Sequence, residues 1–166
     1  MTERFSRRTF LHATAASTGI ALLAGCSSSA DTDSGENGDS DATTTADTES
    51  RDFGGWFDRT DNYDGVHDMT GKDTVSVTVG AEGNGGGYLA FTPAAVKVSP
   101  DTTVVWEWTG NGGTHNVVER ENGLFESEIT STEGHTFEYT FEETGEYRYV
   151  CVPHEQLGMV GAVVVE

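Results

Sequence analysis

The sequence predicts an all-β fold for residues 53–166, an antiparallel sandwich of two sheets. Apolar and polar side chains alternate along residues 75–79, 104–108 and 137–141, and this period of two is typical of strands that bury one face. No segment of this region carries a sustained helical period with capping residues. Turn signals separate the segments, at 83–87, 99–101, 110–113, 122–123 and 143–145. Many short strands joined by turns indicate two packed sheets.

The remaining elements of the domain are expected around these three strands. The β-branched run Val163–Val165 predicts a last strand, and residues 61–71 are interpreted as an extra leading strand with a loop. The segment from Glu143 to Tyr147 resembles the corner at which a tyrosine fastens the edge of a sandwich. The large aromatic side chains on the predicted strands are expected in the core: Trp106, Trp108, Phe137, Tyr139, Phe141, Tyr147 and Tyr149.

Residues 1–25 resemble a signal for export. Arg7 and Arg8 precede a short apolar run, as in twin-arginine signals, which export proteins already folded. The run is shorter than the ~20 apolar residues that span a bilayer. It ends in Leu-Ala-Gly-Cys26, which resembles a lipobox, so Cys26 is predicted to carry a lipid; the alternative is a chance cysteine near an ordinary cleavage site. The protein is therefore expected on the extracytoplasmic face of the cell membrane, held by a lipid anchor.

Residues 26–52 are predicted to form a disordered acidic tether between the signal and the folded domain. From Ser27 to Asp52 the chain contains no large apolar residue, so it cannot bury a core. The only two cysteines, Cys26 and Cys151, lie in different contexts, which argues against a disulfide between them.

The charge of the chain excludes nucleic acid as a partner. Net charge is -19, with 28 acidic residues against nine Lys and Arg, and phosphate binding needs clustered cations. The acidity has two interpretations, a docking surface for a basic partner or the solvated surface of a protein from a very salty environment. The second is favoured, because the acids are scattered along the chain and Lys72 and Lys97 are the only lysines.

Four side chains form a constellation that predicts a metal site. Cys151, His154 and Met159 follow the segment ending at Val150 and fall on one tight loop, and His115 begins another predicted strand. A lone histidine or buried cysteine is more often structural, but a thiolate, an imidazole and a thioether on one loop are poorly explained by chance. Two histidines and a cysteine with a weak axial methionine are the ligand set of copper electron-transfer sites.

The spacing Cys-x-x-His-x-x-x-x-Met, with an upstream His-Asn, resembles the plastocyanin and pseudoazurin family. The acidic composition, twin arginines and lipobox resemble the halocyanin group of that family. The resemblance implies a Greek-key sandwich and one type 1 copper that alternates between Cu(I) and Cu(II). It implies His115, His154 and Cys151 as equatorial ligands and Met159 as the axial ligand.

The same resemblance implies roles for residues around the ligands. Asn116 would tie the strand of His115 to the loop of Cys151, and Pro153, which has no N–H, could not donate a hydrogen bond to the cysteine sulfur. The edge of the His154 ring would be the port for electrons, with Leu157 and Gly112 as candidates for the apolar surface around it. The implied function is a membrane-tethered one-electron carrier, not an enzyme, that acts as a monomer between redox proteins of a respiratory chain.

Other metal chemistries fit the sequence less well. Structural zinc needs four good tetrahedral donors, and methionine is not one of them. A copper oxidase or nitrite reductase needs further histidine motifs, whereas His12, His67 and His135 are single. A two-copper domain needs a second cysteine in the loop, and haem attachment needs Cys-x-x-Cys-His. A copper-binding chaperone or storage protein of the cell surface stays open as the alternative to a carrier.

Overall fold

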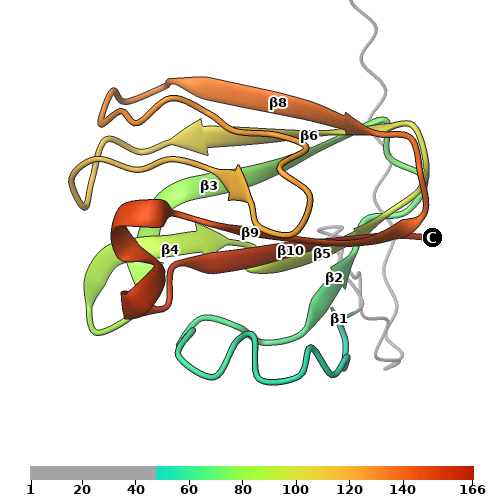
Figure 1. Ribbon diagram of the computed structural model, residues 1–166, viewed down its shortest axis with the longest axis horizontal. Helices are drawn as coiled ribbons and strands as arrows, with labels where there is room; N and C mark the ends of the chain where they lie inside the picture. Colours follow the sequence, from blue (N-terminus) through green and yellow to red (C-terminus); the bar gives the residue numbers. More distant parts are fainter. Residues whose placement is uncertain (1–47) are drawn as a thin grey trace, which may run out of the picture. The chain divides into compact units, whose positions relative to one another are not determined.

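The computed structural model describes residues 48–166, which form ten β-strands and one 3-10 helix (Figure 1). The predicted signal segment 1–25, the lipidation site Cys26 and most of the predicted tether lie outside the described residues. Within the described residues, no helix is long and apolar enough to cross a membrane.

The strands form two sheets, which confirms the predicted sandwich. The six-stranded sheet contains, in spatial order, β1 (Thr48–Glu49), β2 (Val66–Asp68), β5 (Ala95–Val98), β10 (Val160–Val165), β9 (Gly145–Val150) and β7 (Val118–Glu119). The four-stranded sheet contains β4 (Gly87–Thr92), β3 (Thr74–Gly83), β6 (Thr102–Trp108) and β8 (Thr136–Phe141).

The sheets are mixed, whereas the sequence predicted antiparallel ones. β3 pairs with β6, β5 with β10, and β2 with β5 in parallel, and the other strand pairs are antiparallel. The chain crosses from one sheet to the other between β2 and β3, between β4 and β5, and between β5 and β6, so these sequence neighbours do not pair and strands distant in sequence lie side by side in parallel. Alternation of side chains reports which face is buried, but it carries no information on the direction of the neighbouring strand.

The main core lies between the two sheets and is dominated by aromatic side chains. Trp106, fully buried on β6, contacts the rings of Phe141 and Tyr149. Trp108 is equally buried. The remaining aromatic side chains expected in the core are half-buried and pack against the core cluster: Phe137, Tyr139 and Tyr147.

The turn before β9 has the predicted tyrosine corner. The hydroxyl of Tyr147 donates a hydrogen bond of 2.8 Å to the carbonyl oxygen of Glu143, four residues earlier. The bond fixes the turn that reverses the chain from β8 into β9.

Residues 50–65, here called the N-terminal strap, cover the outer face of the six-stranded sheet. Phe53 and Phe57 pack in a second core cluster with residues of β10, including Ala162 and Val164. β10 is therefore buried at all six positions, which explains its continuous apolar run, since a strand covered on both faces does not alternate. Figure 1 shows the strap as a separate layer beside the sheet.

The described structure begins upstream of the predicted domain boundary at residue 53. Thr48 and Glu49 form β1 and pair with His67 and Val66 of β2. The sequence placed both residues in the tether, because a two-residue strand has no apolar alternation to reveal it. Residues 61–71 were interpreted as a strand and loop, and the strand is β2.

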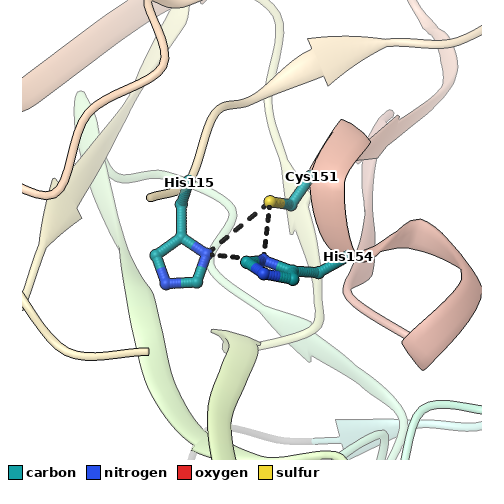
Figure 2. A group of neighbouring side chains, drawn as sticks. All are labelled: His115, Cys151 and His154. Atoms are coloured by element: carbon teal, nitrogen blue, oxygen red, sulfur yellow. Dashed lines mark hydrogen bonds between the residues drawn. The ribbon is translucent and has the colours of Figure 1, made fainter. Parts of the chain in front are cut away.

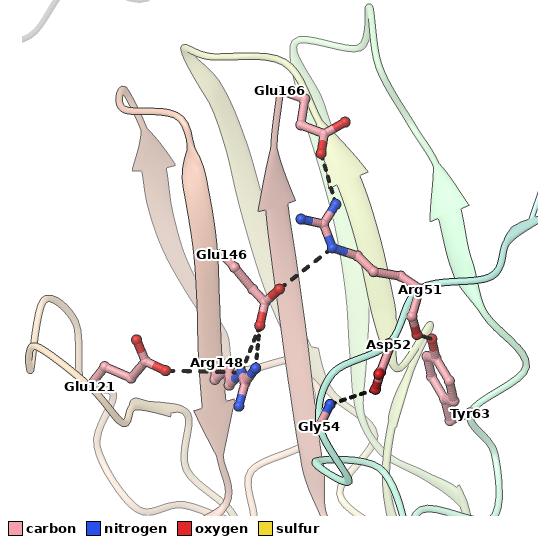
Figure 3. Close-up of polar contacts among 8 residues, drawn as sticks. All are labelled: Arg51, Asp52, Gly54, Tyr63, Glu121, Glu146, Arg148 and Glu166. Atoms are coloured by element: carbon pink, nitrogen blue, oxygen red, sulfur yellow. Dashed lines mark hydrogen bonds and ion pairs between the residues drawn. The ribbon is translucent and has the colours of Figure 1, made fainter.

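Two basic side chains form ion pairs at or next to the ends of the N-terminal strap. The guanidinium of Arg51 contacts the carboxylates of Glu146 and Glu166 at 3.5 and 2.7 Å (Figure 3). The ammonium of Lys97 contacts Glu49 on β1 at 2.9 Å and Asp68 on β2 at 2.8 Å. The hydrogen bond from Lys97, followed by those from Thr70, lowers the pKa of Asp68 from 3.8 to about 2.

Replacing Lys97 with methionine should raise the pKa of Asp68 toward its usual value. Because the folded-state pKa is lowered, the carboxylate stabilises the fold above pH 3.8, and that stabilisation is lost as pH falls toward 2. The variant should lose most of this acid-linked stabilisation. Carboxyl carbon chemical shifts followed by NMR across this pH range would report the pKa.

Lys72→Met is the matched control, since Lys72 contacts the sulfur of Met69 rather than a carboxylate. It should leave the titration of Asp68 unchanged. An unaltered titration in Lys97→Met would show that the Thr70 hydrogen bonds alone hold the pKa down.

Candidate metal centre

His115 is held by its backbone and lies almost wholly inside the protein. Its N–H and carbonyl oxygen form a reciprocal pair of hydrogen bonds with Thr130, at 2.9 and 3.0 Å. The indole N–H of Trp108 donates to the same carbonyl oxygen at 3.3 Å. The side chain is only 1% exposed, so the ring has a fixed position at the end of the core.

Cys151, His154 and Met159 lie on the loop that joins β9 to β10. Cys151 directly follows β9, and Val152–Leu157 form the 3-10 helix η1, where the sequence predicted only a tight loop. The N–H of His154 donates to the carbonyl of Cys151 at 2.9 Å, and the N–H of Cys151 donates to the carbonyl of Met159 at 3.0 Å. Pro153 fits the first turn of η1, because the N–H that it lacks has no partner in that turn.

Three donor atoms from the two regions converge on one point (Figure 2). The Sγ atom of Cys151 lies 3.6 Å from Nδ1 of His115 and 3.4 Å from Nδ1 of His154, and the two nitrogens are 3.2 Å apart. Among residues 48–166, these three side chains are the one group of at least three His, Cys, Asp or Glu residues arranged to hold a metal ion.

The spacing of these atoms fits a bound metal ion. The three distances place a point about 2.0 Å from every donor, and zinc, as a reference ion, binds imidazole nitrogen at about 2.0–2.1 Å and thiolate sulfur at about 2.3 Å. A small outward movement of sulfur would satisfy both bond lengths. One thiolate and two imidazoles suit a soft or borderline ion such as copper.

The tautomer of His115 is fixed by Asn111. Nε2 of His115 lies 2.9 Å from the carbonyl oxygen of Asn111, and a carbonyl oxygen only accepts, so Nε2 carries the proton. In the neutral ring Nδ1 is then unprotonated, and its lone pair faces Cys151 and His154. The hydrogen bond thus prepares the nitrogen for a cation, although no sequence motif singled out Asn111.

Burial opposes every charged form of these three side chains. Desolvation lowers the pKa of His115 and of His154, and it raises the pKa of the Cys151 thiol. The backbone N–H groups of Asn116 and His154 act in the opposite direction on the thiol. In the absence of a cation the cluster is therefore neutral, and a bound metal ion would replace the thiol proton.

Asn116 links the two regions that supply the donors. Its side chain is 2% exposed, and its Oδ1 atom accepts a hydrogen bond of 2.9 Å from the N–H of Val152, the first residue after Cys151. Met159 is fully buried in the same core cluster as Cys151. Its N–H donates to the carbonyl of His154 at 3.2 Å.

η1 presents exposed apolar side chains on both sides of His154 in sequence, together with the exposed polar side chain of Gln156. His154 is half-buried, and Val152 and Leu157 on the same short helix are 47% and 55% exposed. Gly112 is exposed, has a φ of 78°, and lies so close to Tyr88 that a Cβ would overlap the Tyr88 carbonyl oxygen. Only glycine lets this loop approach both Tyr88 and the ring of His115.

The other described histidines lie outside the cluster. His67 bonds Asp64 at 2.9 Å, and His135 packs edge-on against the ring of Trp108 at 4.8 Å. Both are half-buried.

Comparison with known proteins places this site in a family. Residues 75–166 match the model of the copper binding proteins, plastocyanin/azurin family. Halocyanin of Natronomonas pharaonis is 54% identical over 107 residues, which span 63% of this chain and 64% of the halocyanin. The chloroplastic plastocyanin of Tetradesmus obliquus is 33% identical over 104 residues, which span 57% of this chain and 68% of that protein.

A solved structure of a purple cupredoxin from Nitrosopumilus maritimus has a TM-score of 0.47 and 27% identity. The matched region covers 55% of this chain and 99% of the purple cupredoxin chain. The family match extends over more than half of this sequence and includes every residue of the three-donor cluster. The chain therefore belongs to the plastocyanin/azurin family of copper-binding proteins.

Proposed function

We propose that this protein carries electrons one at a time on a single type 1 copper ion held by His115, Cys151, His154 and Met159. The observation that supports it is the convergence of three buried or half-buried donor atoms within 3.2–3.6 Å of one another. Copper supplies the chemistry, since it exchanges one electron between Cu(I) and Cu(II). In this proposal His115, Cys151 and His154 would hold the ion as equatorial ligands, and Met159 would be the axial one.

The chain keeps the donor atoms in place regardless of the charge at the centre. His115 is fixed by its two backbone bonds to Thr130, and the ligand loop is closed by the bond from Cys151 to Met159. Asn116 joins these two regions through Val152. Because the donors cannot move far apart or together, little reorganisation accompanies a change of oxidation state, and electron exchange can be fast.

Electrons enter and leave at the edge of His154 in this proposal. His154 is the half-buried member of the cluster, and the exposed apolar side chains of Val152 and Leu157 flank it on η1. Gly112, exposed and next to the ring of His115, is the other candidate for this surface. An apolar surface suits brief docking of a redox protein, and it stays effective in concentrated salt, where the Debye length is only about 3 Å at 1 M.

The location of the carrier is proposed from the sequence upstream of the described residues. The twin arginines and the lipobox support export and lipidation at Cys26. The residues from 26 to the start of the domain would then act as a tether to the extracytoplasmic face of the membrane. A monomer held by this tether would reach donor and acceptor proteins of a respiratory chain.

Cys151→Ser should abolish the intense blue band of the oxidised, copper-loaded protein in high salt. The band requires a thiolate bonded to Cu(II), and serine cannot supply one. Visible absorption before and after ascorbate would test this, since the native band should bleach on reduction and return on reoxidation. Copper that binds only as exchangeable Cu(I), with no stable blue state, would support the chaperone or storage alternative.

Met159→Leu should keep both the copper and the blue colour while raising the reduction potential. A thioether on the axial position stabilises Cu(II), and leucine removes it without adding a polar group. Protein-film or solution voltammetry would measure the change. A lower potential, or complete loss of copper, would contradict the axial role.

Leu157→Gln should slow electron self-exchange between reduced and oxidised copies by roughly fivefold, since an apolar contact at a docking centre contributes about 1 kcal/mol or more. NMR line broadening in mixtures of the two oxidation states measures this rate. Leu124→Gln is the matched control, because Leu124 is 47% exposed but lies by Glu143 and Tyr147 rather than by η1. Equal slowing in both variants would contradict a docking role for η1.

A further inference from the structure

We propose that Thr60 and Asn84 are positioning residues for the copper site, which act on Met159 by fixing the peptide group that precedes it. This inference rests on the axial role proposed above for Met159. Thr60 belongs to the N-terminal strap, which lies upstream of the residues matched by the family model. The strap would thus tune a site to which it contributes no ligand.

The strap and the ligand loop are in direct contact at Gly158. Gly158 ends η1 with a φ of 91°, and a Cβ there would overlap the carbonyl oxygen of Arg59. The guanidinium of Arg59 also donates to Gln156, to its backbone carbonyl oxygen and to its side-chain Oε1, each at 3.4 Å. The residue before Met159 must therefore be glycine for the strap to pass this close.

Two buried side-chain donors meet the carbonyl oxygen of Gly158, which also accepts from the N–H of Val160 at 2.9 Å. The hydroxyl of Thr60 donates to it at 2.9 Å, and Nδ2 of Asn84 donates to it at 2.9 Å. Thr60 is 7% exposed and Asn84 is 9% exposed. The two side chains come from segments outside the ligand loop, and together with Val160 they fix the direction of this carbonyl and the plane of the peptide bond that leads into Met159.

Asn84 joins the strap to the hairpin between β3 and β4. Its Oδ1 accepts from the N–H of Asp61 at 2.9 Å, and its Nδ2 also donates to the carbonyl of Leu89 at 2.6 Å. A carboxylate oxygen of Asp61 in turn accepts from the N–H of Gly85 at 3.0 Å. Asn84 therefore holds three segments together: the strap, the hairpin and the ligand loop.

The backbone of Met159 has its other constraints from the ligand loop itself. Its carbonyl accepts from Cys151 and its N–H donates to the carbonyl of His154. At the carbonyl of Gly158, by contrast, two of the hydrogen bonds to the peptide that precedes Met159 come from side chains outside the loop, Thr60 of the strap and Asn84 of the hairpin. Loss of the Thr60 hydrogen bond would leave this carbonyl to Asn84 and Val160 and would loosen the peptide that leads into Met159, while the three-donor cluster stays intact.

The strap is rigid enough to serve as a platform. The indole N–H of Trp56 donates to the carbonyl of Gly161 on β10 at 3.1 Å. Phe53 packs edge-on against Phe57 at 5.0 Å, and Phe57 stacks on Tyr63 at 4.1 Å. Thr60 lies between these anchors, so its hydroxyl has a fixed direction.

The test compares Thr60→Val with Thr60→Ser, which keeps the hydroxyl, and with Thr102→Val. Thr102 is the matched control, since its buried hydroxyl donates to a backbone carbonyl, that of Lys72 at 3.1 Å, at the start of β6 and away from η1 (Figure 1). In the metal-free full-length protein, hydrogen exchange of the Met159 amide should become about fivefold faster in Thr60→Val, the effect of losing one buried hydrogen bond. In the copper-loaded protein the reduction potential should rise, as the axial contact weakens.

Thr60→Ser should restore both values, and Thr102→Val should change neither. Unchanged exchange and potential in a folded Thr60→Val protein would overturn the inference, as would equal changes in Thr102→Val. If Thr60→Val fails to fold, Asn84→Asp replaces it, because aspartate keeps the acceptor for Asp61 and loses the donors to Gly158 and Leu89. Its Met159 amide should exchange faster in the metal-free protein, and this exchange decides the test, because the added negative charge by itself lowers the potential. A native protein without a blue band would refute the proposed function, whereas the exchange of the metal-free protein would still decide the positioning role.

Discussion

The register between β9 and β10 is the constraint on which the candidate metal centre depends. The strands pair from Gly145 opposite Val165 to Val150 opposite Val160, and the bond from Cys151 to Met159 continues the ladder into the loop. A slip of one residue would turn every side chain of β10 to the other face. Such a slip would exchange the residues of β10 that pack between the sheets with those that pack beneath the strap, and it would break the bond from Cys151 to Met159.

The remaining donor depends on how the two sheets pack. His115 lies between β6 and β7, where Trp108 and Thr130 hold its backbone, and Asn116 ties it across to the ligand loop. β7, which follows His115, also pairs directly with β9, Val118 opposite Val150, so the distance between the two imidazole nitrogens is set by this pairing together with the packing of the sheets rather than by either loop alone. A close-packed interior changes that spacing only at considerable cost, which is what a site with little reorganisation needs.

Sequence reasoning reached the parts of this structure that have a local signal. Alternation along 75–79, 104–108 and 137–141 corresponds to β3, β6 and β8, and the spacing from Cys151 to His154 brought together residues that the fold also brings together. The parallel pairing of β3 with β6 had no such signal. Asn111 was missed because it acts through its own backbone carbonyl, in an irregular turn, and not through its side chain. Thr60 was missed because its partner, the carbonyl of Gly158, is distant in sequence, and the sequence does not show which carbonyl a hydroxyl group will bind.

The acidity of the chain bears on how the strap stays in place. Few cations are available, and Arg51, Lys97, Arg120 and Arg148 each contact one carboxylate or more. Exposed ion pairs of this kind contribute about 0–1 kcal/mol each and weaken as salt rises. The aromatic cluster of the strap behaves in the opposite way, since burial of apolar surface is not screened and is strengthened by salts excluded from the protein surface. In concentrated salt the strap would therefore be held by its rings and by the hydrogen bonds at Gly158, so its contact with the ligand loop would persist where the ion pairs at its ends fade.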